Sequence, residues 1–159
     1  EEAGMITNSK NPAFVVSAQD GRVMNELGHT ATEKITSEQT GGAYYVFDLV
    51  SPPGGGIPPH VHSLEDEIIF VVDGDFEVFL DGKLFPAGPG AVMNFARGTA
   101  HAFTNVGTKP GKTRWVVTPG TSFQSFFREL AEVPPGPPDM GKIVALFGKY
   151  GMGVLPPPG

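Results

Sequence analysis

Residues 54–74 read GGGIPPHVHSLEDEIIFVVDG, and three features of this stretch decide the fold. Glycines and prolines lead into His60 and His62, which are separated by a single residue. An almost wholly apolar run then spans residues 67–72 and ends at an Asp-Gly pair, which favours a hairpin turn. Because residues i and i+2 of a strand point to the same side, both imidazoles can converge on one point. The stretch therefore predicts paired strands with two histidines on one face.

The chain from residue 14 to residue 118 reads as short strands between turn signals. The apolar run at 67–72 predicts a strand that is covered on both faces. Residues 52–59 (PPGGGIPP) predict a stiff, irregular loop. The other expected strands lie at residues 14–18, 31–36, 43–50, 75–80, 91–95, 100–106 and 112–118. Many short strands at regular spacing predict an all-β sandwich or barrel, and the pattern alone does not distinguish the two.

Residues 119–159 change to a helical pattern. A helix capped by Thr121 or Ser122 is expected to run to Ala131, and a second one to span residues 138–150. Their apolar positions are Phe123, Phe126, Phe127 and Leu130 in the first helix, and Ile143, Leu146 and Phe147 in the second. We therefore expect a flexible segment at 1–13, a strand-rich core at 14–118 and a helical extension at 119–159. Residues 1–4, which precede Met5, are taken as a cloning remnant.

The composition excludes several classes of protein. There are no cysteines, so disulfides, thiolate zinc sites, iron–sulfur clusters and cysteine nucleophiles are excluded. No run of 18 apolar residues is present, which argues against a membrane span. The net charge is −6 and the lysines and arginines are scattered singly, which argues against a nucleic-acid partner. A cysteine-free chain without a signal-peptide pattern fits a cytoplasmic location.

The chain has four histidines, and three of them suit one site together with a carboxylate. His101 opens the late strand AHAFTNV, and Glu67 lies five residues after His62. Three neutral imidazoles and one carboxylate are good ligands for a divalent transition metal. Such a set leaves one or two positions open for water or substrate. His29, between Gly28 and Thr30, is interpreted as a structural or surface histidine.

The spacing of these residues resembles the two motifs of the cupin superfamily. The first motif is matched at every spacing by Gly54, His60, His62, Glu67 and Gly74. The second motif is matched by Gly90, Gly98, His101 and Asn105, with Ala96 in place of the usual proline. The resemblance implies a small antiparallel β-barrel, also called a jelly roll or double-stranded β-helix, with one or two short C-terminal helices. It also implies one iron, manganese, nickel, cobalt, copper or zinc ion on His60, His62, Glu67 and His101.

Three further stretches resemble the quercetin 2,3-dioxygenase-like group of single-domain cupins: residues 52–67, the helical tail that begins at Pro119, and residues 149–159. This resemblance implies a dioxygenase that uses O₂ on an aromatic or enolic small molecule, with Glu67 as general base. The expected substrate pocket consists of Tyr45, Phe47, Met93 and Phe103, with Phe126 or Phe127 covering its mouth. The simpler interpretation of these aromatic side chains is plain core packing.

Several alternatives remain open from sequence. The same ligands suit a non-oxidative isomerase, epimerase, lyase or decarboxylase, and a non-catalytic binding protein is a third possibility. Glu65 and Asp66 either face solvent or orient a ligand histidine. Arg97 and Arg114 form surface ion pairs or hold an anionic substrate, and Asn105 is a turn residue. The resemblance implies a homodimer, which also fits the apolar strand face formed by Ile68, Phe70 and Val72.

Overall fold

The computed structural model describes residues 11–156, so residues 1–10 of the flexible segment expected at 1–13, and residues 157–159 of the expected C-terminal extension, lie outside the described residues. Within that range the strands are β1 (Arg22–Glu26), β2 (His29–Ile35), β3 (Tyr45–Ser51), β4 (Gly56–His62), β5 (Asp66–Asp73), β6 (Phe76–Leu80), β7 (Lys83–Ala87), β8 (Val92–Phe95), β9 (His101–Asn105), β10 (Gly111–Thr118) and β11 (Met152–Val154). A 3₁₀ turn (Glu38–Thr40) and two helices, α1 (Thr121–Leu130) and α2 (Met140–Lys149), complete the described fold.

The strands form two antiparallel sheets. One sheet has the order β1-β2-β3-β10-β5-β8, and the other has the order β11-β4-β9-β6-β7. Both sheets contribute inward side chains to one apolar core, so the all-β jelly roll expected from sequence is confirmed. The pairings of the described strands do not join the two sheets into a closed barrel. The architecture is therefore an open two-sheet jelly roll rather than a fully hydrogen-bonded cylinder.

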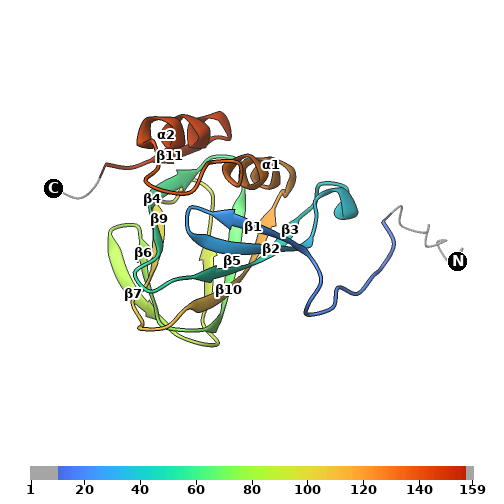
Figure 1. Ribbon diagram of the computed structural model, residues 1–159, viewed down its shortest axis with the longest axis horizontal. Coiled ribbons are helices and arrows are strands. Elements are labelled where there is room, and N and C mark those ends of the chain that lie inside the picture. The colour runs from blue at the N-terminus through green and yellow to red at the C-terminus, as the bar shows by residue number, and fades with distance from the viewer. Residues whose placement is uncertain (1–10, 157–159) are drawn as a thin grey trace, which may run out of the picture.

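Both helices lie at the same end of the jelly roll, where α2 runs beside β11 (Figure 1). Helix α1 is attached to the core by its aromatic side chains. The rings of Phe123 and Phe127 lie 5.8 and 4.5 Å from the ring of Phe47 on β3. Helix α2 contacts α1 through the rings of Phe126 and Phe147, which are 5.0 Å apart. The two helices therefore cover one end of the space between the sheets.

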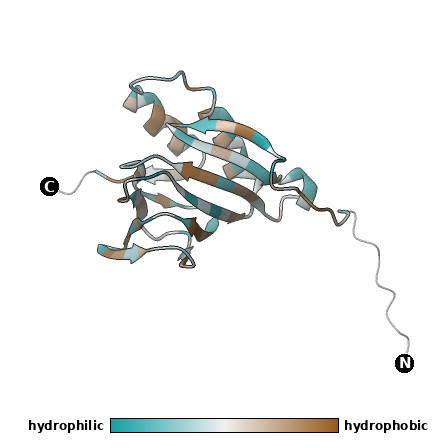
Figure 2. Ribbon diagram, turned by 60° about the horizontal axis from the view of Figure 1, so that its bottom comes forward, coloured by the Kyte–Doolittle hydropathy of each residue, from teal (hydrophilic) through white to brown (hydrophobic). Residues whose placement is uncertain are grey.

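The strands carry both hydrophobic and hydrophilic residues (Figure 2), and on β2 and β10 the buried positions follow the two-residue period. On β3, Tyr45, Phe47 and Leu49 are buried together on the inner face, as predicted. The strand predicted to be covered on both faces is β5, and that prediction is wrong for the chain by itself. Phe70 and Val72 on its outer face are 41% and 49% exposed.

The loop predicted at 52–59 is wrong, because β4 begins at Gly56 and includes two prolines. A register shift between Ile57 and His60 interrupts the pairing of β4 with β9. Prolines are tolerated at such bulges because no ladder hydrogen bond is required of their nitrogen. The bulge is therefore the reason that a proline-rich segment can continue directly into the histidine strand.

Four other elements differ from the sequence prediction. Residues 14–18 form no strand, whereas β1, β7 and β11 were not predicted. Pro86 argued against a strand at β7, because proline disrupts the hydrogen bonding of central strands. Strand β7 is at the edge of its sheet, where proline is tolerated. Strand β11 was missed because it has only three residues and because Met152 and Gly153 have little strand propensity.

Helix α1 begins differently from the prediction. Its N-cap is Gly120, with no side-chain cap bond, instead of Thr121 or Ser122. A Cβ atom at position 120 would lie 2.6 Å from the carbonyl carbon of Tyr44, so glycine is required for this close approach. Neither described helix is long and apolar enough to span a membrane.

Candidate metal centre

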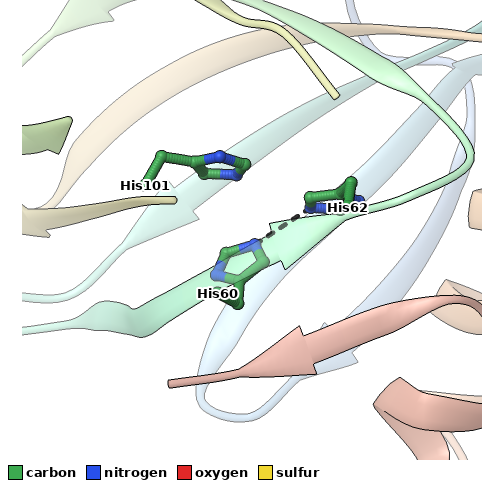
Figure 3. Close-up of side chains that lie close together, drawn as sticks. All are labelled: His60, His62 and His101. Atoms are coloured by element: carbon green, nitrogen blue, oxygen red, sulfur yellow. Dashed lines mark hydrogen bonds between the residues drawn. The ribbon is translucent and has the colours of Figure 1, made fainter. Parts of the chain in front are cut away.

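The three histidines and Glu67, which were predicted to act together, are brought together by three strands. His60 and His62 lie on β4, and His101 opens β9, where it pairs with His60 across the ladder. Glu67 lies on β5 of the opposite sheet. All four side chains are at most 5% exposed. The three imidazoles converge on one point between the sheets (Figure 3).

The distances between side-chain atoms describe a compact cluster. The Nε2 atoms of His60 and His62 are 3.0 Å apart. The Glu67 carboxylate places Oε1 3.1 Å from His62 Nε2 and Oε2 3.3 Å from His101 Nε2. One ligand atom from each histidine lies within 4.8 Å of the others, so the three can hold a metal ion.

The hydrogen bonds of the three Nδ1 atoms, which point away from the centre of the cluster, determine the tautomer of each ring. His60 Nδ1 lies 2.8 Å from the Pro58 carbonyl oxygen, and His101 Nδ1 lies 3.0 Å from the Thr99 carbonyl oxygen. A carbonyl oxygen only accepts hydrogen bonds, so each Nδ1 must carry the hydrogen. His62 Nδ1 lies 2.6 Å from Oε1 of Glu65, which is also buried. In the neutral rings all three Nε2 atoms therefore present lone pairs to the centre.

This arrangement fits a cation. Both Glu67 oxygens and His101 Nε2 are buried without a hydrogen-bond partner among the described residues. Burial, together with the nearby His101, lowers the pKa of His60 to about 4, so its ring is neutral near pH 7. Burial raises the pKa of Glu67, but positive charge on His62 and a hydrogen bond and positive charge from His101 outweigh this and lower it. When the rings are neutral, a cation would have to supply that positive charge. An ionised carboxylate and inward lone pairs are the donors that a divalent transition metal requires.

Residues near the cluster resolve two alternatives left open by the sequence. Glu65 orients His62 through the contact described above and does not face solvent. Asp66 is exposed and pairs with Arg97, whose Nε lies 3.1 Å from Asp66 Oδ1. Arg114 likewise pairs with Asp48, at 2.6 Å between Nε and Oδ1. Both arginines are therefore engaged in ion pairs with carboxylates.

His29 and Asn105 also have the structural roles that were predicted. His29 Nδ1 lies 2.8 Å from the Ser51 hydroxyl oxygen, and His29 is not part of the histidine cluster. Burial lowers the pKa of His29. The Asn105 side-chain amide donates to the carbonyl oxygens of Ser51 and Lys109, and its oxygen accepts from the Gly107 amide. Asn105 thus fixes the turn after β9.

An apolar cavity of about 200 Å³ adjoins the cluster and is lined by His60 and Glu67. None of the four pocket residues expected from sequence lines it. Tyr45, Phe47, Met93 and Phe103 are buried in the core instead. The lining aromatic side chains are Trp115, Phe123, Phe126, Phe127 and Phe147. Phe126 and Phe127, expected at the mouth, do contribute to the wall.

Sequence reasoning missed the contributions of α2 and of the β1–β2 hairpin to this cavity. Ile143 and Phe147 line it from α2, and Glu26 and Leu27 line it from the hairpin. The three- and four-residue spacing of apolar residues in α2 indicated a buried face but not what that face covers. A buried glutamate at the end of an unpredicted strand left no signal in the sequence.

Comparison with known proteins agrees with this fold. Residues 47–121 match the family model described as the cupin domain. The chain is 36% identical over 110 residues to germin-like protein 1-4 of Oryza sativa subsp. japonica, covering 62% of this chain and 46% of that protein. It is 26% identical over 95 residues to quercetin 2,3-dioxygenase of Bacillus subtilis (strain 168), covering 60% of this chain and 28% of that protein.

The chain thus spans less than half the length of these curated relatives. Among solved structures, KdgF from Halomonas sp. superimposes with a TM-score of 0.63 at 18% identity. That match covers 71% of this chain and 99% of KdgF, and it shows the fold alone. Residues 47–121 therefore form a cupin domain, in a chain that has the cupin jelly-roll fold.

Proposed function

We propose that this chain is a metal-dependent cupin dioxygenase that acts on an aromatic or enolic small molecule. In this proposal His60, His62, Glu67 and His101 bind one divalent transition metal. The observation that carries the proposal is the buried cluster beside an apolar cavity. Both Glu67 oxygens and His101 Nε2 lack a hydrogen-bond partner among the described residues, and Glu67 and His60 line the cavity. A buried carboxylate facing imidazole lone pairs is costly unless a cation lies between them.

A divalent transition metal bound there would supply Lewis acidity toward a substrate oxygen and, if redox-active, a route for electrons to O₂. Glu67 supplies a base. Its carboxylate lines the cavity and is ionised, so it can accept the proton of an enol whose oxygen lies beside the histidines. The phenylalanines of α1 and α2 exclude water from this region, which strengthens the electrostatic interactions of the site.

The volume of the cavity limits the size of the substrate. Its volume is about 200 Å³, whereas an engineered protein cavity of about 150 Å³ binds benzene. A ligand of one or two rings therefore fits without movement of α1 or α2. A three-ring flavonol fits only if the helices move apart. We accordingly favour one- and two-ring enols or phenols over quercetin itself as substrates.

Elemental analysis tests the metal proposal. Protein purified without a metal-affinity step should contain close to one transition metal ion per chain, and His62→Ala should contain none. His29→Asn is the matched control, because His29 is a buried histidine that lies outside the cluster. It should keep its metal. An absence of metal in the wild type, even after reloading, would overturn the proposal.

An O₂-uptake screen tests the reaction. The metal-loaded chain would be assayed with acetylacetone, with 3-hydroxychromone (a two-ring flavonol core) and with quercetin. A dioxygenase places both atoms of O₂ in its products, so the products of each turnover should together carry two ¹⁸O atoms from ¹⁸O₂. Glu67→Gln should abolish turnover. Anaerobic turnover with zinc would instead identify a non-oxidative isomerase or lyase, and ligand binding without turnover would identify a binding protein.

We also propose that the chain forms a homodimer through the outer face of its six-stranded sheet. Phe70 and Val92 are neighbours across the β5–β8 ladder and are 41% and 59% exposed. Together with Val72 they form an apolar patch that water would otherwise cover. Light scattering should report a dimer for the wild type and a monomer for Val92→Lys. Leu84→Lys, which changes an exposed leucine on β7 of the other sheet, should stay dimeric. A monomeric wild type would refute the proposal.

A further inference from the structure

Glu26 is a buried acid on the wall of the cavity and has no part in the metal centre. It ends β1, is 3% exposed and lines the same cavity as His60 and Glu67. Three strands, β2, β3 and β10, separate its strand from β5, which carries Glu67. The cavity therefore has a second polar position, separate from the histidine cluster.

The side chain of Glu26 lacks partners, whereas its polar neighbours have them. Neither Oε1 nor Oε2 of Glu26 has a hydrogen-bond partner within residues 11–156. Glu33 on the adjacent strand accepts from the Tyr45 hydroxyl at 2.7 Å and from Arg128 Nε at 3.1 Å. His29, which also lines the cavity, is bonded to Ser51. Apart from Glu67 of the metal centre, Glu26 is thus the described wall residue whose hydrogen-bonding capacity is left for a ligand.

The surroundings favour the neutral form of this acid. Burial raises the pKa of Glu26 to about 9, and the nearby Glu33 adds to the effect. Arg128 forms ion pairs with Glu33 and Glu38. A protonated carboxyl group offers one donor and one acceptor and repels neither ketones nor hydroxyls. A buried group of this kind without a partner is destabilising, which is characteristic of sites completed by a ligand.

We propose that Glu26 selects the ligand of the cavity by hydrogen bonding to a neutral oxygen, a ketone or a hydroxyl, on the part of the ligand away from the histidine cluster. The substrate class is then a one- or two-ring apolar molecule with two oxygen functions, one for each polar position. This inference rests on the proposed function for the oxygen beside the histidines. The Glu26 contact itself requires no metal.

Isothermal titration calorimetry with two matched probes tests this inference. Indane and 1-indanone have the same two-ring skeleton and differ by one carbonyl oxygen. Both are titrated into the full-length wild type, Glu26→Gln and Glu26→Leu, so that any interaction at the metal is common to all three proteins. Relative to indane, 1-indanone should bind about tenfold more weakly to Glu26→Leu than to the wild type. This change in the ratio of the two dissociation constants is equivalent to about 1.4 kcal/mol. Glu26→Gln keeps a donor and an acceptor and should keep most of the wild-type ratio.

Two controls separate a specific hydrogen bond from a general change in the cavity. Met140→Leu alters another lining residue with no polar group and should leave the ratio unchanged. Infrared difference spectra between the wild type and Glu26→Gln should show a protonated carboxyl band at pH 7. Saturating 1-indanone should move that band, and indane should not. A band that 1-indanone leaves in place would contradict the proposed contact.

Other outcomes would overturn the inference. An equal ratio in the wild type and Glu26→Leu, or no binding of either probe to the wild type, refutes it. Tighter binding of 1-aminoindane than of 1-indanone would make Glu26 an ion-pair partner instead of a neutral donor. A chain that binds no metal but shows the Glu26-dependent ratio would refute the proposed function and leave this inference intact. A chain that binds metal but shows no dependence of the ratio on Glu26 would refute only the inference.

Discussion

Replacing Glu26 by glutamine should make the protein more stable, and increasingly so as the pH rises. The pKa of Glu26 is about 9 in the folded chain and 4.5 in the unfolded reference. Between these values the folded state holds one proton more than the unfolded state. The wild type therefore loses stability as the pH rises through this window, at about 1.4 kcal/mol per pH unit. Glutamine does not titrate and removes this loss.

The expected magnitude follows from the width of the window. From pH 5 to pH 8 the free energy of unfolding of Glu26→Gln, relative to wild type, should rise by about 4 kcal/mol. Urea unfolding at each pH, followed by the fluorescence of Trp115, measures this difference. All other titratable groups are present in both proteins, so their contributions cancel. Glu77→Gln, at an exposed position on β6, should show a flat difference. A flat difference for Glu26→Gln as well would mean that Glu26 is ionised in the fold, and the reasoning would be refuted.

Three further substitutions test separate parts of the structure. Glu65→Ala removes the acceptor for His62 Nδ1 and should weaken metal binding by about 10- to 100-fold while the stoichiometry stays the same, as chelator competition would show. Phe47→Ala removes a fully buried ring that contacts α1 and should cost about 3–5 kcal/mol in urea unfolding; a loss near zero would contradict the packing described. Arg97→Ala breaks an exposed ion pair with Asp66, and its urea midpoint should match that of the wild type.

The histidine cluster was predictable because its geometry is local. The i, i+2 spacing of His60 and His62 requires only that their segment is extended, and the two cupin motifs add Glu67 and His101. The jelly roll followed from the same motifs and from the number of short strands. These signals depend on spacing along the chain, so they are visible before any tertiary contact is known.

The cavity was not predictable because its walls come from segments that are distant in sequence. Inward-facing aromatic residues such as Tyr45 and Phe103 can fill a core or line a pocket, and their alternation is identical in both cases. Helices α1 and α2 decide the outcome by covering one end of the jelly roll. Phe123 and Phe127 pack on Phe47 and remove it from the cavity wall. Only the docked position of the helices contains that information.

The pairing of β11 with β4 has a consequence for how the protein is synthesised. Met152 and Val154 lie opposite His62 and His60 in that ladder. The Ser63 hydroxyl donates to the Gly151 carbonyl across a sequence separation of 88 residues. When β4 leaves the ribosome, neither of its neighbours has been synthesised. Strand β9 can pair with one edge of β4 first, and the other edge stays open until β11 emerges. Loop closure of this length is slow. We expect the nascent chain to acquire its final metal affinity only after this late strand docks.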